Sequence, residues 1–146
     1  MTDTLGCDSD SRTSLPARGA LPAETGRTTE ALAALLLEKR GYRILCLNWR
    51  SRWGEVDIVA EHGDCLVFVE VKARASTGHG RPAEAVTRQK QRKILRAAGL
   101  YTILNHAEDR NIRFDVVELV SDRRTGAWEL RVLENAFSAG DGYSAL

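Results

Sequence analysis

Apolar side chains at helical spacing mark two segments of the chain. Residues 28–40 begin at Thr28, a residue that can cap a helix, and stop before Gly41. Residues 83–104 carry a second helical pattern. We therefore predict two helices. Their inward faces are expected to carry Ala31, Leu32, Leu35 and Leu36 in the first helix, and Ala85, Ile94, Ala98 and Tyr101 in the second.

Five other segments are rich in β-branched and aliphatic residues, which is typical of strands. Residues 42–48 form the first, and residues 54–74 form two more, joined by a tight turn at His62 and Gly63. Residues 112–120 and 128–133 follow the second helix, and the last of them is expected at the sheet edge. The order α-β-β-β-α-β-β predicts an α/β fold, with a mixed central sheet flanked by helices.

The composition indicates one globular domain with polar ends. The chain has 146 residues, 43% of them hydrophobic and 28% charged, which is enough for one core. Residues 1–25 lack an apolar period and are expected to form a disordered tail, whereas residues 136–146 are expected to form a flexible C-terminus. Residues 26–135 remain as the domain. The absence of a long apolar run or a signal-peptide pattern favours a cytoplasmic protein.

Charged residues interrupt the apolar hairpin. Asp57 lies within its first strand, and Glu70 and Lys72 lie two residues apart in the run Val-Phe-Val-Glu-Val-Lys. Buried charges are costly unless they are paired or bound to an ion. A turn at His62 and Gly63 puts Asp57 diagonal to Glu70 on one face of the hairpin, whereas a three-residue loop puts it on the opposite face.

Two carboxylates on one face suggest a site for a divalent cation. Asp57 and Glu70, with water and the Val71 carbonyl, would offer only oxygen ligands, which suit Mg²⁺ or Mn²⁺ and not zinc. Lys72 is placed to orient a water or to stabilise charge on a phosphate oxygen. These parts together suit phosphodiester hydrolysis. The alternatives are a weak surface ion pair, a structural core ion pair, or acid–base chemistry on a sugar.

Basic residues cluster after the hairpin. The net charge is only +1, but residues 73–107 hold seven basic residues against a single acid, Glu84. Solvated helix faces normally mix signs, so this stripe favours phosphate contacts along DNA or RNA. Trp49 and Trp53 could also stack on bases, although at least one is expected in the core. The basic candidates are Arg50, Arg52, Arg74, Arg81, Arg88, Lys90, Arg92, Lys93 and Arg96.

Four motifs in order resemble the YraN-like bacterial proteins. They are GEVDIVA, FVEVKAR, RPAEAVTRQKQRKILRAA and RFDVV, and the resemblance covers residues 26–120. The family is regarded as one of predicted endonucleases related to archaeal Holliday-junction resolvases, within the restriction-endonuclease-like superfamily. The resemblance implies that fold, a Mg²⁺ (or Mn²⁺) cofactor and a branched or structured DNA partner. A homodimer is expected by analogy, because resolving a junction takes two symmetric cuts.

The resemblance also implies a set of site residues. The superfamily pattern of an acid on the first helix, an Asp on the second strand and Glu-x-Lys on the third corresponds to Glu30, Asp57, Glu70 and Lys72. From the helix alone, Glu30 is an acid that stabilises the positive helix end. The resemblance instead makes it a site acid beside the metal ligands Asp57 and Glu70, with Gln89 and Lys90 as further candidates. The main alternative is a nucleic-acid-binding module that does not cut.

Overall fold

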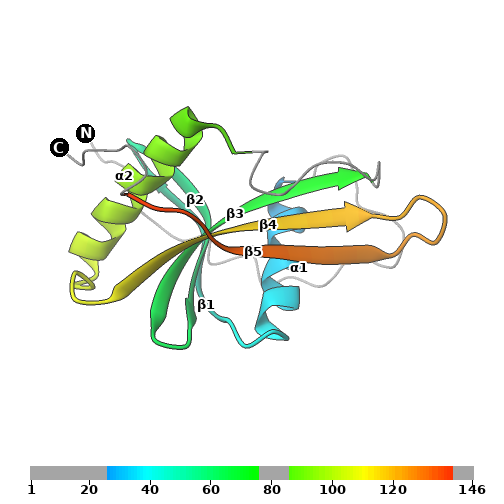
Figure 1. Ribbon diagram of the computed structural model, residues 1–146, viewed down its shortest axis with the longest axis horizontal. Coiled ribbons are helices and arrows are strands. Elements are labelled where there is room, and N and C mark those ends of the chain that lie inside the picture. Colours follow the sequence, from blue (N-terminus) through cyan, green and yellow to red (C-terminus); the bar gives the residue numbers. More distant parts are fainter. Residues whose placement is uncertain (1–25, 76–85, 140–146) are drawn as a thin grey trace.

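The computed structural model describes residues 26–75 and 86–139 of the chain. These residues form two helices and five strands, in the order predicted from the sequence (Figure 1). The elements are α1 (Gly26–Glu38), β1 (Arg43–Ser51), β2 (Gly54–His62), β3 (Cys65–Ala75), α2 (Arg88–Leu104), β4 (Asn111–Ser121) and β5 (Trp128–Phe137). The α/β class and the α-β-β-β-α-β-β order are therefore confirmed.

The five strands form a single mixed sheet in the order β1-β2-β3-β4-β5. Strands β3 and β4 are parallel, and the other neighbouring pairs are antiparallel. A parallel pair needs a crossover, which α2 supplies between β3 and β4. Strand β5 lies at the edge of the sheet, as predicted.

The two helices cover opposite faces of the sheet, and each face has its own apolar core (Figure 1). On the α2 face, Phe68 of β3 packs edge-to-face against Tyr101 with ring centroids 5.6 Å apart. On the α1 face, Leu37 packs among the aliphatic side chains of the central strands. Because strand residues alternate between faces, Glu70 and Lys72 share the α2 face with Phe68.

The inward face of α1 differs from the prediction. The structure buries Ala33, Ala34 and Leu37, whereas Leu35 is 38% exposed. Leu32 and Leu36 of the predicted face are partly buried against the same core, so the helical period is correct and the centre of the inward face is shifted to Ala33, Ala34 and Leu37. Two small alanines let the helix approach the sheet closely, which favours this face over one lined by leucines.

Helix α2 begins at Arg88, later than the predicted start near residue 83. Thr87 has an extended backbone, and its side chain accepts a hydrogen bond from Lys90 N at 3.2 Å, which caps the helix. Of the predicted inward residues, Ile94, Ala98 and Tyr101 are buried, and Ala85 lies outside the described residues.

Strand β5 extends four residues beyond its predicted end at residue 133. The Phe137 ring, 5% exposed, stacks on Phe114 with ring centroids 5.1 Å apart. Residues 136 and 137, expected in the flexible C-terminus, therefore belong to the sheet, because this ring contact extends the strand.

The hairpin turn lies one residue later than predicted. His62 pairs with Cys65, so the turn residues are Gly63 and Asp64. Gly63 has φ +60°, and glycine is favoured at the first position of a two-residue turn when φ is positive there. The turn still has two residues, so Asp57 and Glu70 share a face as predicted. Continued by one residue past its last pair, Ile58 and Val69, this register sets Asp57 opposite Glu70 instead of diagonal to it.

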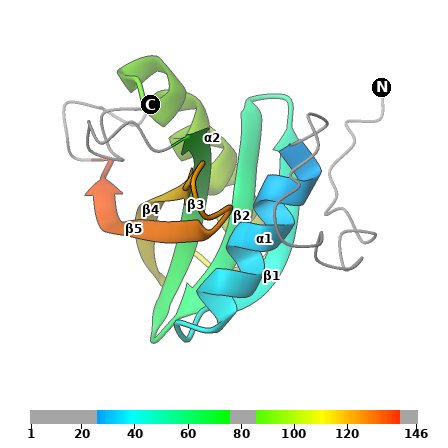
Figure 2. The same cartoon turned by 90° about the vertical axis from the view of Figure 1, so that its right-hand side faces the viewer.

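The sheet opens between β2 and β3. The ladder between them ends at the pair Ile58 and Val69, whereas β2 continues to pair with β1 and β3 continues to pair with β4. The sheet thereby divides into a β1–β2 wing and a β3–β4–β5 wing, with α1 lying over β1 and β2 (Figure 2). We call the point of separation the fork. Asp57 lies one residue before Ile58, and Glu70 and Lys72 lie one and three residues after Val69. All three are therefore at the fork.

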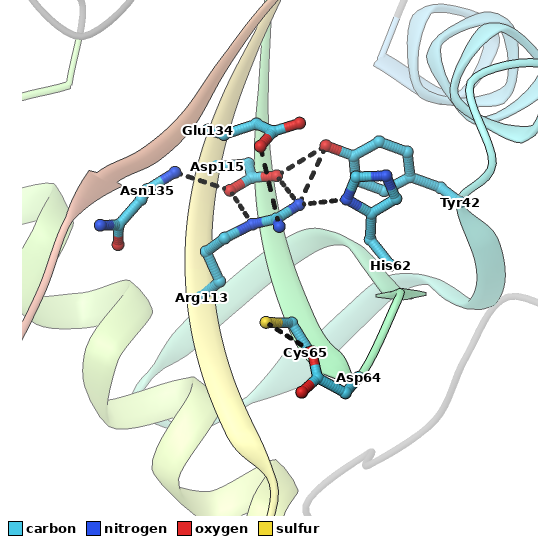
Figure 3. Close-up of polar contacts among 8 residues, drawn as sticks. All are labelled: Tyr42, His62, Asp64, Cys65, Arg113, Asp115, Glu134 and Asn135. Carbon is cyan, nitrogen blue, oxygen red and sulfur yellow. Dashed lines mark hydrogen bonds and ion pairs between the residues drawn. The ribbon is translucent and has the colours of Figure 1, made fainter.

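A second polar cluster on the α1 face ties the elements together (Figure 3). Asp115, fully buried, accepts two hydrogen bonds from Arg113 and one each from the Tyr42 hydroxyl and Asn135 N, all at 2.9 Å. Arg113 Nη2 also lies 2.8 Å from His62 Nδ1, which must then be the unprotonated ring nitrogen. The Arg-Phe-Asp motif of β4 therefore has a structural role, joining the starts of β1 and β4 to the end of β5.

Candidate active site

Asp57 fills the gap that opens at the fork. Its Oδ2 accepts a hydrogen bond from Val71 N at 2.8 Å. This backbone N–H lies beyond the last pair of the β2–β3 ladder, so a side chain replaces the missing strand as its acceptor. The side chain is thereby fixed beside Glu70, and the residue as a whole is only 8% exposed.

Two lysines converge on Glu70. Lys72 Nζ, from the same strand, lies 3.6 Å from Glu70 Oε1. Lys90 Nζ, from the first turn of α2, lies 2.5 Å from the same oxygen. The Glu70 side chain is 2% exposed, so its charge requires such partners. Lys90 was predicted to contact nucleic acid, and the structure places its ammonium group inside the candidate site.

Glu30 reaches the cluster from α1. The helix begins at Gly26, so Glu30 lies beyond the first turn and the helix-dipole interpretation is wrong. Burial raises the pKa of its carboxyl, the Asp57 and Asn48 side chains partly offset this rise, and the charge of Glu70 adds to it. Within the described residues, Glu30 Oε2 is buried without a hydrogen-bond partner. A buried carboxylate oxygen without a donor is suited to a water or an ion.

The electrostatics of Asp57 reflect the crowding of acids. Burial and the nearby charge of Glu70 raise the pKa of Asp57 to about 9, although the hydrogen bond from Val71 N acts in the opposite direction. The charge of Glu30 adds to the rise. A divalent cation bound between these acids would offset this rise. Carboxylates so close together that their charges disfavour simultaneous ionisation are characteristic of functional sites.

The carboxylates fit a hard divalent cation with few protein ligands. In residues 26–75 and 86–139, no group of three or more His, Cys, Asp or Glu side chains is arranged to hold a metal. Asp57 and Glu70 lie across from each other and could supply two oxygens. Mg²⁺ commonly takes one or two carboxylates and keeps several waters or substrate phosphates. Asp57 and Glu70 therefore suit an ion that completes its shell with water.

Arg74 continues the row of charges along β3. Its guanidinium pairs with Glu118 of β4, through Nε to Oε1 and through Nη2 to Oε2 at 3.3 Å. Glu118 is 3% exposed, whereas the Arg74 side chain is 25% exposed. Glu70, Lys72 and Arg74 alternate along one strand face, so this pair extends the site toward β4.

The structure separates the remaining basic candidates into groups. Arg50 pairs with Glu55 at 3.7 Å on β2, and both side chains are more than half exposed. Arg81 and the loop before it lie outside the described residues. Exposed positions of α2 hold Arg88, Gln89, Arg92, Lys93 and Arg96. Trp49 is core at 4% exposure and Trp53 is 44% exposed, which confirms that at least one tryptophan is buried.

Sequence reasoning missed two residues of the site, Asn48 and Glu118. Asn48 is 6% exposed, lies on an apolar strand and has φ +51°. Glu118 interrupts the apolar run of β4, as Asp57 interrupts that of β2. The same signal, a polar residue within a buried strand, would have found both. Nothing in the sequence distinguishes Lys90, which contacts Glu70, from the neighbouring basic residues of α2.

Comparison with known proteins assigns the chain to a family. Residues 29–119 match the family described as "Uncharacterised protein family UPF0102". The chain belongs to this family. A UPF0102 protein of Lachnoclostridium phytofermentans is 45% identical over 115 residues, covering 78% of this chain and 92% of that protein. One from Symbiobacterium thermophilum is 46% identical over 114 residues, covering 78% and 96%.

The family assignment confirms the resemblance to the YraN-like proteins. The matched residues 29–119 include Glu30, Asp57, Glu70, Lys72 and Lys90, so every charged residue that converges at the fork lies in the part of this UPF0102 protein that defines its family. None of the helices within the described residues is long and apolar enough to span a membrane.

Proposed function

We propose that this UPF0102 protein is a metal-dependent endonuclease that hydrolyses phosphodiester bonds in branched or otherwise structured DNA. The observation that supports this most strongly is the convergence at the fork. Three acids, Glu30, Asp57 and Glu70, meet there with the ammonium groups of Lys72 and Lys90. Carboxylates beside lysines, in a partly dry site, are the groups that phosphodiester hydrolysis requires.

Each residue has a distinct part in the proposed reaction. Asp57 and Glu70 would hold Mg²⁺ or Mn²⁺, and the bound ion would lower the pKa of a water and stabilise charge on the phosphate. Lys72 orients the attacking water or stabilises the phosphate oxygens, as a lysine so near the acids can do both. Glu30 Oε2, which is buried without a partner, would accept a hydrogen bond from a water beside the acids and so position that water for attack.

The basic surface supports a nucleic-acid substrate. The exposed cations of α2 lie on the same helix as Lys90. A phosphate backbone bound along this helix would therefore lead to the fork. Arg74, held by Glu118, adds a planar guanidinium that suits phosphate oxygens. Backbone contacts fix the position of DNA and carry no sequence information directly, which suits an enzyme that recognises shape. Paired cuts at a junction would require a homodimer.

The direct test is cleavage of labelled four-way, flap, duplex and single-stranded DNA by the purified full chain with Mg²⁺ or Mn²⁺. Glu70→Gln and Lys72→Met should each reduce the rate by at least about a hundredfold, a usual effect of removing a catalytic group. Glu108→Gln and Lys39→Met are the matched controls, because both residues are exposed and lie outside the site. Both should retain full activity.

The outcomes separate this proposal from its rivals. Cleavage that persists unchanged in both site variants would point to a contaminant and overturn the site assignment. Salt-dependent binding without cleavage under any divalent ion would favour a non-catalytic nucleic-acid-binding module. The exposed cations of α2 are the observation that keeps this second candidate, since they would serve binding with or without the acids.

A further inference from the structure

The Trp53 side chain is exposed at the turn that joins β1 to β2. It is 44% exposed, whereas Trp49 is in the core and Trp128 is half-buried. Tryptophan is the residue most often found at the energetic centre of binding surfaces. An exposed tryptophan beside the basic helix α2 is therefore a candidate ligand contact.

The turn holds Trp53 in a fixed position. Ser51 Oγ accepts a hydrogen bond from Trp53 N at 3.2 Å and donates one to Gly54 O at 2.9 Å. Gly54 has φ +149°, and a Cβ at this position would lie 3.2 Å from Lys93 Cβ, so the turn lies directly on α2. A residue presented by such a turn is pre-organised, and binding to it orders little additional chain.

Two guanidinium groups lie close to the Trp53 ring. The Cζ atom of Arg52 lies 5.0 Å from the ring centroid, and that of Arg96, from α2, lies 5.7 Å from it. Each contact is favourable. An aromatic ring beside cations is the combination with which proteins bind single-stranded nucleic acid, because bases stack on the ring and phosphates pair with the cations.

We propose that Trp53, Arg52 and Arg96 form a stacking site for one unpaired nucleobase and its neighbouring phosphates. The inference rests on the proposed function and deepens it by naming a feature of the substrate. Gly54 is about 10 Å of strand from Asp57, at about 3.3 Å per residue. A few nucleotides span a length of this order. The preferred substrate therefore carries an unpaired base a few nucleotides from the cleaved bond.

The experiment compares two single-stranded oligonucleotides of equal charge, one with all bases and one with abasic sites at its centre. Binding to the full chain is measured in EDTA by anisotropy and by tryptophan emission. The wild type should prefer the base-bearing strand by roughly tenfold and lose emission on binding it, because stacking on one aromatic side chain contributes an affinity of this order. Trp53→Ala should remove both effects, Trp53→Phe should keep part of the preference, and Trp128→Phe should keep all of it.

The results distinguish this inference from the endonuclease itself. Equal affinity of the wild type for both strands, or a Trp53→Ala loss that is the same for both, overturns the stacking site and leaves cleavage unaffected. A base preference that depends on Trp53 without any cleavage supports the stacking site and overturns only the endonuclease. Absence of binding to either strand overturns both the stacking site and the nucleic-acid substrate.

Discussion

Lys90 Nζ lies 2.5 Å from Glu70 Oε1, which brings the first turn of α2 into the carboxylate cluster at the fork. Lysine so close to a helix N-terminus opposes the helix dipole, and no acidic residue in that first turn compensates. The pairing with Glu70 offsets this cost. Burial acts to lower the pKa of Lys90, but the contact with Glu70 outweighs burial and raises the pKa overall, so the side chain stays charged.

The first prediction is that Lys90 competes with a divalent ion for Glu70. Lys90→Met removes the ammonium group and keeps an apolar stem of similar length. Its apparent affinity for Mn²⁺ without DNA should rise by roughly three- to tenfold, a modest figure because the Lys90 side chain is 45% exposed. Calorimetric Mn²⁺ titration measures this. Lys93→Met, one helical turn further, is the control, and an affinity that is unchanged in Lys90→Met contradicts the competition.

The second prediction concerns pH. The pKa of Asp57 is about 9 in the folded protein and 3.8 ordinarily, so the folded state binds the extra proton between these values. The stability that Asp57 contributes is fully present below pH 3.8 and is lost progressively as pH rises toward about 9. In EDTA, the Tm of the wild type should therefore fall across this window relative to that of Asp57→Asn. Adding Mn²⁺ should raise the Tm of the wild type again and should leave the Tm of Asp57→Asn unchanged.

Thermal unfolding at a series of pH values measures this difference. Asp109→Asn, in the exposed turn after α2, is the matched control and should follow the wild type. Parallel Tm curves for Asp57→Asn and the wild type would show that Asp57 does not carry the proton.

The third prediction is that Glu118 positions Arg74 for a substrate phosphate. Glu118→Gln keeps the shape and removes the charge that fixes the guanidinium. We expect KM for DNA cleavage to rise by roughly three- to tenfold with kcat little changed, since the lost contact serves ground state and transition state alike. Glu118→Asp should restore part of the affinity. The control is Glu129→Gln, an exposed acid on β5, and a drop in Tm without a change in KM would mean a structural role only.

The fourth prediction is that the Tyr42–Arg113–Asp115 cluster stabilises the fold and takes no part in the reaction. Asp115→Asn should cost about 3 kcal/mol of unfolding free energy, because it leaves a mostly buried guanidinium without its counter-charge. Tyr42→Phe removes the hydrogen bond that the hydroxyl donates to Asp115 and the one that it accepts from Arg113, and should cost about 1 to 2 kcal/mol. Urea unfolding measures both, with Asp109→Asn, in the exposed turn after α2, as the control. Loss of DNA cleavage in a variant that remains folded would contradict this assignment.

The sequence by itself determined the order of the elements and the shared face of Asp57, Glu70 and Lys72. Both depend on local rules, because hydrophobic periodicity sets each element and a two-residue turn preserves strand parity. The turn could lie at His62 or at Gly63 without changing that parity, so the face was correct although the turn was misplaced. The excess of basic residues in 73–107 is also evident from the sequence, because counting charges does not require the fold.

Only the tertiary structure decided which distant groups meet at the fork. Glu30 and Lys90 come from helices on opposite faces of the sheet, and they reach one cluster because β2 and β3 separate after Ile58 and Val69. Nothing local distinguishes Lys90 from the other basic residues of α2. Its role depends on where the helix begins and how it crosses the sheet, and long-range packing sets both.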